Sequence, residues 1–211
     1  MIINKTTQDI IRVLLNEKGK KLKMRELSSK AKVSLGMTSK IVNSLESCGL
    51  LKKKKGIEVV NWEILLKSWS YTVSINENKK IEFMAAERPQ YLIKKINNLL
   101  RGEVYALTLF SATEIISPYV APNKVHLYLL EGKEKKISNI FVNVGIMPAE
   151  EGNIVCYLVD EKYFYGAKEM RGIKIISLPQ LYVDLITYGG RGEEAAEQVF
   201  NLMRKENVRS N

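Results

Sequence analysis

The segment from Leu22 to Val60 constrains the fold more than any other part of the sequence. It reads as a short helix, a tight turn and a second helix, followed by two short strands around a glycine. The second helix is expected to begin after Ser34, whose hydroxyl can cap free backbone amides, and to end at Gly49, which tolerates a left-handed backbone. This order of elements is typical of a winged helix-turn-helix.

The second helix of this segment is amphipathic. Apolar or small residues recur at the spacing of one buried helical face at Leu35, Thr38, Ile41, Val42 and Leu45. An α-helix fits the major groove of DNA by its width, and Asn, Lys and Ser side chains can reach base edges there. The residues of the opposite face that we expect to approach the groove are Met37, Ser39, Lys40 and Asn43.

Basic stretches lie on both sides of the helix pair. Residues 50–54 and 57–60 are expected to form a hairpin, the wing, and residues 19–24 an extended segment that pairs with it. Cations at these places would lie over phosphates, where they displace counterions and strengthen binding without reading sequence. The phosphate contacts are assigned to Lys20, Lys21, Lys23, Arg25, Lys52, Lys53, Lys54 and Lys55.

Nearly all of the net positive charge lies in one part of the chain. Residues 1–72 carry 15 Lys and Arg against 6 Asp and Glu, a net charge of +9, whereas residues 73–211 carry only +1. Charge that coincides with a groove-reading helix is the expected footprint of nucleic-acid binding. A lysine run is nevertheless ordinarily a solvated face, and many winged helices dock on protein, so protein docking stays open as the alternative.

The composition places the chain among soluble globular proteins. Its 211 residues allow two modest domains, and 45% hydrophobic with 27% charged residues is ordinary for this class. No window approaches the ~20 apolar residues that span a bilayer, and the N-terminus lacks an export signal, so we expect a cytoplasmic protein. Cys48, Cys156 and His126 form no metal-ligand pattern. We expect no metal and no cofactor, and both cysteines buried.

The remainder of the chain predicts a second domain with mixed structure. Strands are expected at residues 104–109, 125–130, 140–144, 154–159 and 173–177. They alternate with helices, which gives an α+β fold: a winged helix followed by a mixed α/β domain. The expected division is a DNA-binding domain at 1–73, a linker at 74–87 and a regulatory or partner-binding domain at 88–211.

The second domain offers little catalytic chemistry. Gly189-Gly190-Arg191-Gly192 invites comparison with a phosphate loop, but the glycines follow a helix and no Lys-Ser/Thr pair succeeds them, so a turn is the better interpretation. His126 lies in an expected strand, where packing is a more common role than general base. No nucleophile with a histidine and a carboxylate can be assembled.

Two segments carry a resemblance to a known family. LTLFSATEIISPYVAPNKVHLYLL (107–130) and SLPQLYVDLITYGGRGEEAAEQVFNLM (177–203), placed after a basic winged helix, resemble the AbiEi-like antitoxins and transcriptional regulators of type IV toxin-antitoxin systems. The most specific portion is 179–196. The resemblance implies a winged helix that binds the promoter of its own operon and a C-terminal domain linked to antitoxin action and related in shape to nucleotidyltransferases.

The same resemblance allows a test for catalysis. A working nucleotidyltransferase would need a Gly-Ser loop before a helix and a D-x-D or D-x-E pair on the next strand to hold magnesium. Phe110-Ser111 and His126-Leu127-Tyr128 stand at those places. The metal-binding carboxylates are missing, so we expect a nucleotidyltransferase-like domain that is not an enzyme.

The leading hypothesis is a cytoplasmic, DNA-binding transcriptional regulator, an antitoxin-like repressor of its own operon. The expected partners are double-stranded DNA and a nucleotidyltransferase-type toxin, with a homodimer as the default because many such regulators match two-fold operators. The alternatives are an interaction module that docks protein and senses a ligand, and a residual transferase. The sequence does not indicate the operator, the effector or the strand order.

Overall fold

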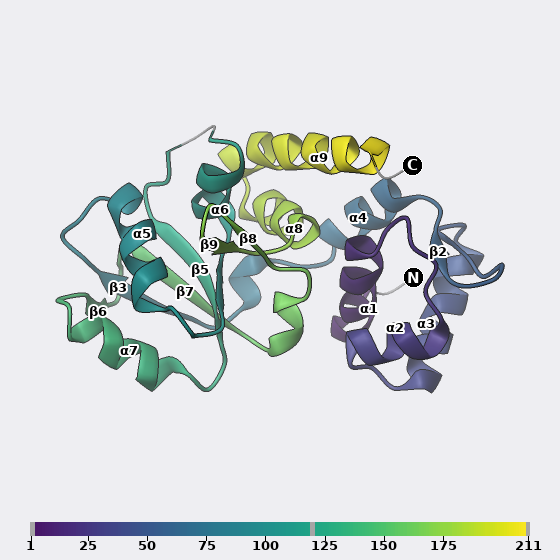
Figure 1. Cartoon of the computed structure of the whole chain (residues 1–211), viewed down its shortest axis with the longest axis horizontal. Helices are drawn as coiled ribbons and strands as arrows, with labels where there is room; N and C mark the ends of the chain where they lie inside the picture. Colours follow the sequence, from purple (N-terminus) through teal and green to yellow (C-terminus); the bar gives the residue numbers. More distant parts are fainter. Residues whose placement is uncertain (1–2, 119–120, 210–211) are drawn as a thin grey trace.

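The computed structural model describes residues 3–118 and 121–209, with side chains as far as Glu206. It contains an N-terminal part of helices with a short hairpin (residues 3–72), and a sheet part that follows (Figure 1). The elements of the N-terminal part are α1 (Lys5–Asn16), α2 (Met24–Ala31), α3 (Leu35–Ser47), β1 (Leu51–Lys52), β2 (Glu58–Val59) and α4 (Trp62–Ser70).

The elements of the sheet part alternate less regularly than expected. In chain order they are η1 (Ile75–Glu77), β3 (Lys80–Met84), α5 (Pro89–Leu99), β4 (Tyr105–Leu107), α6 (Leu109–Ile116), β5 (Val125–Leu130), α7 (Glu134–Val142), β6 (Met147–Ala149), β7 (Ile154–Val159), η2 (Glu161–Phe164), β8 (Lys168–Met170), β9 (Ile173–Ile175), α8 (Leu178–Tyr188) and α9 (Arg191–Arg209).

Helix α3 has the expected bounds and the expected caps. The Ser34 hydroxyl accepts a hydrogen bond from the Met37 backbone amide at 3.4 Å, and Gly49, just past the helix, has φ +72°. The face that packs inward is Thr38, Ile41, Val42 and Leu45. Leu35 was expected on that face, but it is 45% exposed, because it is the first helical residue and lies at the rim of the core.

The hairpin forms where the lysine-rich sequence predicts it. Strands β1 and β2 are antiparallel, and Leu22 makes an isolated bridge to Ile57 with N–O distances of 2.9 and 2.8 Å. The basic stretch at 19–24 is thus tied to the hairpin by a bridge of one residue pair and not by a full strand. At the turn Gly56 has φ +126°, a conformation that side chains rarely adopt.

The sheet part is built on a seven-stranded mixed sheet within the described residues, in the order β6-β3-β7-β5-β4-β9-β8. The pairs β5–β7 and β4–β9 are parallel, and the other neighbours are antiparallel. Strands β5 and β7 are buried almost throughout, as expected for central strands covered on both faces.

Two expectations for this part were wrong. The sequence predicts a linker at residues 74–87, but β3 lies inside the sheet between β6 and β7. Its hydrogen-bonding partners are strands that are distant in the sequence. Residues 140–144 were expected to be a strand, but they fall at the end of α7 and just after it. Ile137 and Phe141, one helical turn apart, are the residues that α7 buries, so the helical spacing prevails over the β-branched composition.

The last two helices pack closely on each other. Gly189 and Gly190 both have positive φ and separate α8 from α9, as the turn interpretation predicts. Gly192 has no room for a side chain, since a Cβ there would lie 2.3 Å from the Leu185 carbonyl oxygen. From this contact α9 runs back along the molecule to α4 of the N-terminal part (Figure 1).

The cysteines and the lengths of the apolar helices can be compared with the expectations. Cys156 is buried, but Cys48 is exposed at the end of α3, contrary to expectation. In the part of the chain that the structure describes, no helix has the length and apolar character needed to cross a bilayer.

Candidate nucleic-acid interface

The outer face of α3 is open to solvent at the end of the molecule farthest from the sheet (Figure 1). Met37 is 43% exposed, Lys40 and Asn43 are exposed, and Ser39 is intermediate. These four are the residues that the sequence assigned to a groove. The face therefore combines an apolar side chain, a cation, an amide and a hydroxyl on one accessible surface.

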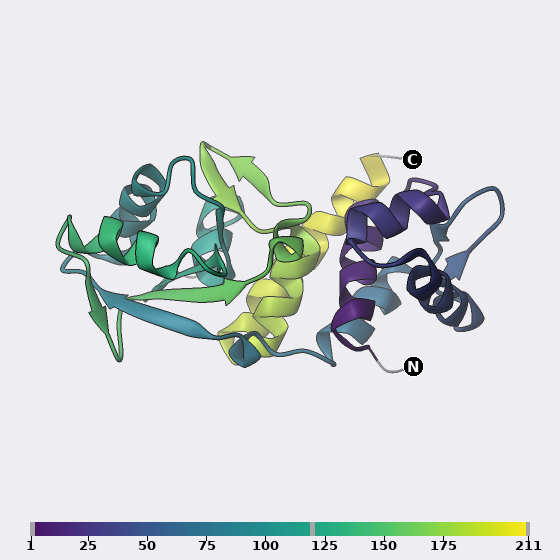
Figure 2. The same ribbon diagram turned by 90° about the horizontal axis from the view of Figure 1, so that it is seen from below.

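The lysine hairpin lies directly beside this face. The Lys53 ammonium is 2.7 Å from Asn43 Oδ1 and 2.7 Å from Glu46 Oε2, and the Lys53 backbone amide donates to Glu46 Oε1 at 3.1 Å. Figure 2 shows the hairpin loop projecting from the same end of the molecule as α3. The contacts fix the hairpin against the helix and bring two separate sequence motifs into one surface.

The eight predicted phosphate-contacting cations are all exposed. Lys20 pairs with Glu17 at 2.8 Å and Lys21 with Glu58 at 3.6 Å, so both already have an acidic partner. Within the described residues no ion pair is formed by Lys23, Arg25, Lys52, Lys54 and Lys55, nor by Lys40 of α3. This second group is the one whose charge is most available to an anionic partner.

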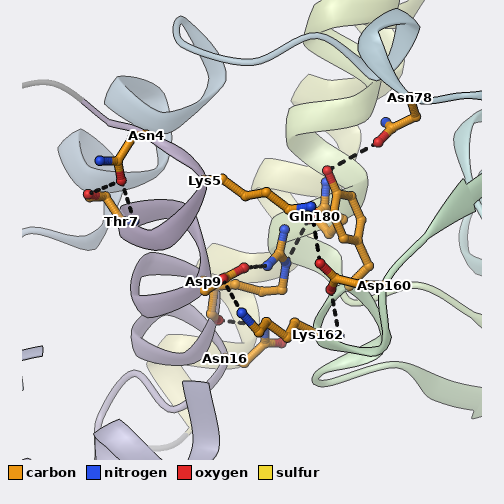
Figure 3. A network of polar contacts seen from close by, with 11 residues as sticks. Asn4, Lys5, Thr7, Asp9, Asn16, Asn78, Asp160, Lys162 and Gln180 are labelled. Carbon is orange, nitrogen blue, oxygen red and sulfur yellow. Dashed lines mark hydrogen bonds and ion pairs between the residues drawn. The ribbon is translucent and has the colours of Figure 1, made fainter. Parts of the chain in front are cut away.

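A buried polar junction joins the N-terminal part to the sheet part (Figure 3). Arg12 of α1 is 1% exposed; its Nε donates to Gln180 Oε1 at 2.9 Å and its Nη1 lies 3.0 Å from Asp9. The Asp9 carboxylate also forms an ion pair with the Lys162 ammonium at 2.9 Å. The Arg12 guanidinium lies 4.4 Å from the centroid of the Tyr163 ring. Both parts thus contribute charges to one desolvated cluster.

The junction continues into the sheet through Asp184, which is 1% exposed. Burial raises the pKa of Asp184, hydrogen bonds from Thr108, Gln180 and Tyr128 oppose this, and the resulting pKa is about 6. Gln180 therefore connects the two clusters, because it accepts from Arg12 and donates to Asp184. The arrangement is fully hydrogen-bonded and enclosed, which suits a structural network.

His126 also faces this side of the sheet, between the rings of Tyr157 and Tyr188. It is 2% exposed, and burial lowers its pKa to about 4 with a smaller contribution from Lys124. The Ser111 hydroxyl accepts a hydrogen bond from the His126 backbone amide at 2.9 Å. Ser111 and His126, which the resemblance compares with a nucleotidyltransferase loop and metal strand, are thus packed together in the core.

A cavity lies beside the glycine turn of the sheet part. It has a volume of about 400 Å³ and is lined in part by Phe110, Asn123, Tyr188 and Arg191. Among the described residues, no group of three or more His, Cys, Asp or Glu is placed to hold a metal ion.

Two important residues were not indicated by the sequence. Glu46 holds Lys53, but only the register of the hairpin against α3 shows this contact. Arg12 looks like a surface residue of an amphipathic helix until α8 and the 160–163 segment enclose it. A cation flanked on both sides by apolar residues, as in IIRVLL, is the available sequence signal.

Comparison with known proteins gives one positive result. A family model described as transcriptional regulator, AbiEi antitoxin, type IV toxin-antitoxin system matches residues 58–204. The match begins in β2 and reaches α9, so it covers α4 and the whole sheet, while α1 to α3 lie outside it. Neither the search of curated proteins nor that of solved structures found a matching protein. Since the matched residues make up more than half of the chain, the protein belongs to the AbiEi antitoxin family of transcriptional regulators of type IV toxin-antitoxin systems.

Proposed function

We propose that this AbiEi-family protein binds double-stranded DNA through residues 3–72, which act as a winged helix-turn-helix. In this proposal α3 enters the major groove, and Met37, Ser39, Lys40 and Asn43 approach the base edges. The hairpin is the wing, and its lysines lie along the phosphate backbone together with Lys20, Lys21, Lys23 and Arg25. The alternative is a module that docks on protein.

The observation that carries the proposal is the position of the hairpin. Lys53 of the hairpin contacts Asn43 and Glu46 of α3, and its neighbours Lys52, Lys54 and Lys55 are exposed, which supports one continuous DNA-binding surface. A surface of this kind can present base-reading groups and cations to one duplex at the same time. The net charge of +9 on residues 1–72 acts in the same direction.

Membership of the family supports a proposal for the biological role. We propose that the protein is the antitoxin of a pair whose toxin is a nucleotidyltransferase-type enzyme, and that it represses its own operon from the cytoplasm as a homodimer on a two-fold operator. The sheet part serves as a nucleotidyltransferase-like but inactive regulatory domain. Support for inactivity comes from Phe110-Ser111 and His126-Leu127-Tyr128, which stand at the expected loop and metal strand and include no carboxylate.

A salt-dependence experiment tests DNA binding. The affinity for a duplex containing the region upstream of its own gene is measured between 50 and 300 mM salt for wild type and for the triple variant Lys52→Ala, Lys54→Ala, Lys55→Ala. The variant should bind every duplex more weakly, with a slope of log K against log salt that is smaller by up to about 0.9 per lost phosphate contact.

The matched control removes the same charge from the other end of the molecule. Lys133, Lys135 and Lys136 lie at and in α7, at the opposite end from the hairpin (Figure 1). Their replacement by alanine should leave affinity and slope close to wild type. Equal losses in the two triple variants, or no binding of any duplex by wild type at low salt, would refute the proposal.

A further inference from the structure

The amide of Asn43 has a defined orientation. A lysine ammonium carries three donors and no acceptor, so the amide atom 2.7 Å from Lys53 Nζ is the oxygen. The Asn43 NH₂ group is therefore the end of the amide that is left to face the surroundings. In most asparagines this choice is ambiguous, but here the chemistry of the neighbour decides it.

Glu46 keeps Lys53 in this position. One carboxylate oxygen accepts from the Lys53 side chain at 2.7 Å and the other from the Lys53 backbone amide at 3.1 Å. Two of the three ammonium protons are thus directed at Asn43 and Glu46, and the third remains for another acceptor. The three side chains form a unit that spans α3 and the hairpin.

This unit changes what Asn43 can recognise. A free asparagine reads adenine with both ends of its amide: the oxygen accepts from the N6 amino group and the NH₂ donates to N7. In this protein the oxygen is engaged by Lys53, and the ammonium beside it repels an approaching amino group. The Asn43 NH₂ and the third Lys53 proton present donors only, which complement the two acceptors of guanine, O6 and N7.

We propose that Asn43 and Lys53 act together as a donor-only pair that selects guanine at one position of the DNA site, with Glu46 as the positioning residue. The inference rests on the proposed DNA-binding function and deepens it, because it names the base that this surface prefers. Lys53, which the proposed function groups with the phosphate-contacting lysines of the hairpin, then contributes to sequence preference instead, whereas Lys52, Lys54 and Lys55 contact phosphate.

Selection from a library of random 20-base-pair duplexes tests the pair, followed by competition with duplexes altered at one base pair. Wild type should prefer guanine about 5- to 10-fold at one position, and Asn43→Ala should lose the preference at that position alone. Lys53→Met frees the amide oxygen and should change the preference there to adenine. Glu46→Ala should weaken the guanine preference without abolishing binding.

The control is Lys54→Met, which removes the same charge from a neighbour that makes no ion pair in the described structure. It should weaken binding to all sequences alike and leave every base preference unchanged. Adenine selected by wild type at the Asn43-dependent position, an unaltered preference in Lys53→Met, or no Asn43-dependent position at all would overturn the inference. Failure of wild type to bind any duplex at low salt would instead overturn the proposed function itself.

Discussion

Arg12 shows how a single side chain can tie two parts of a molecule together. A buried guanidinium is costly unless charges and hydrogen bonds replace its water, and here Asp9, Gln180 and the Tyr163 ring do so. Removal of the cation would leave Asp9, which is 3% exposed, with Lys162 as its remaining ion-pair partner. Most of the expected loss of stability comes from the buried Asp9 carboxylate that has lost a cation, and less from the lost Arg12–Asp9 contact itself.

We therefore expect Arg12→Met to lower the free energy of unfolding by about 3 kcal/mol, in the range found when one member of a buried ion pair is removed. The measurement is urea denaturation at neutral pH. The control is Arg204→Met, which removes an ion pair with Glu63 whose arginine is 52% exposed, and it should have a far smaller effect. Similar losses in the two variants would contradict this account.

The second residue-scale prediction concerns pH. The pKa of His126 is about 4, below the ordinary value of 6.5, so between these values the unfolded chain binds a proton that the fold excludes, and stability falls as the pH is lowered. The pKa of Asp184 is about 6, above the ordinary 3.8, so in that window the fold holds a proton that the unfolded chain releases, and stability falls as the pH is raised. The two contributions oppose each other.

Between pH 5 and 6 wild type should thus show little change in stability from this pair. Asp184→Asn removes one contribution, and the variant should lose up to about 1.4 kcal/mol per pH unit on acidification because His126 acts alone. Urea midpoints at pH 5.0, 5.5 and 6.0 give the slope. The double variant with His126→Phe should restore a flat profile; a flat profile in Asp184→Asn itself would show that His126 is not the responsible group.

At the scale of elements, the α8–α9 turn illustrates how glycines are used. A phosphate loop is one possible interpretation of the sequence Gly-Gly-Arg-Gly. In the structure, however, a Cβ added at Gly192 would lie 2.3 Å from the Leu185 carbonyl oxygen. Close approach of two helices thus accounts for this glycine. By contrast, Gly36 in α3 has nothing within 4 Å of an added Cβ and no unusual backbone angle.

Gly192→Ala should consequently lower the free energy of unfolding by about 1–3 kcal/mol, because the backbone of α8 must move. The matched substitution Gly36→Ala should raise it by up to about 1 kcal/mol through helix propensity. Thermal unfolding of the two variants beside wild type measures both. If Gly192→Ala were as stable as wild type, the helices would not be held at this distance.

At the scale of the whole molecule, α9 and the polar junction connect the N-terminal part to the sheet part. Phe200 of α9 packs on Trp62 at 5.3 Å between ring centroids, the Lys18 ammonium donates to the Met203 carbonyl at 2.9 Å, and the Tyr165 hydroxyl donates to Glu17 at 2.5 Å. These contacts join α9 to α4 and to Lys18, and the segment after η2 to the C-cap of α1. They bury charged and aromatic groups that neither part could bury alone.

Unfolding should accordingly occur in one transition. Both tryptophans, Trp62 and Trp69, lie in the N-terminal part, so fluorescence follows this part while far-ultraviolet circular dichroism follows the whole chain. The two urea curves should coincide, as expected for a two-state protein. Separate midpoints for fluorescence and circular dichroism would show that the parts unfold independently.

The sequence by itself determined those helices, strands and turns that depend on residues close to one another in the chain. The bounds and caps of α3, the hairpin around Gly56, strands β5 and β7 and the turn between α8 and α9 follow from periodicity, capping and glycine conformation, which act within a few residues. The exposed positions of Met37, Lys40 and Asn43 follow in the same way from helical spacing.

Only the tertiary structure decided what depends on distant partners. Strand β3 is short and its sequence is polar enough for a linker, but β6 and β7 complete it. The Asn43–Lys53–Glu46 unit forms because the hairpin packs with Lys53 beside α3. Arg12 is buried because Gln180 of α8, which is 168 residues away in the sequence, packs against it. The residue pattern of a segment predicts the local conformation of that segment. Which segments pair with each other depends on the apolar surface that they bury together, and no single segment shows this.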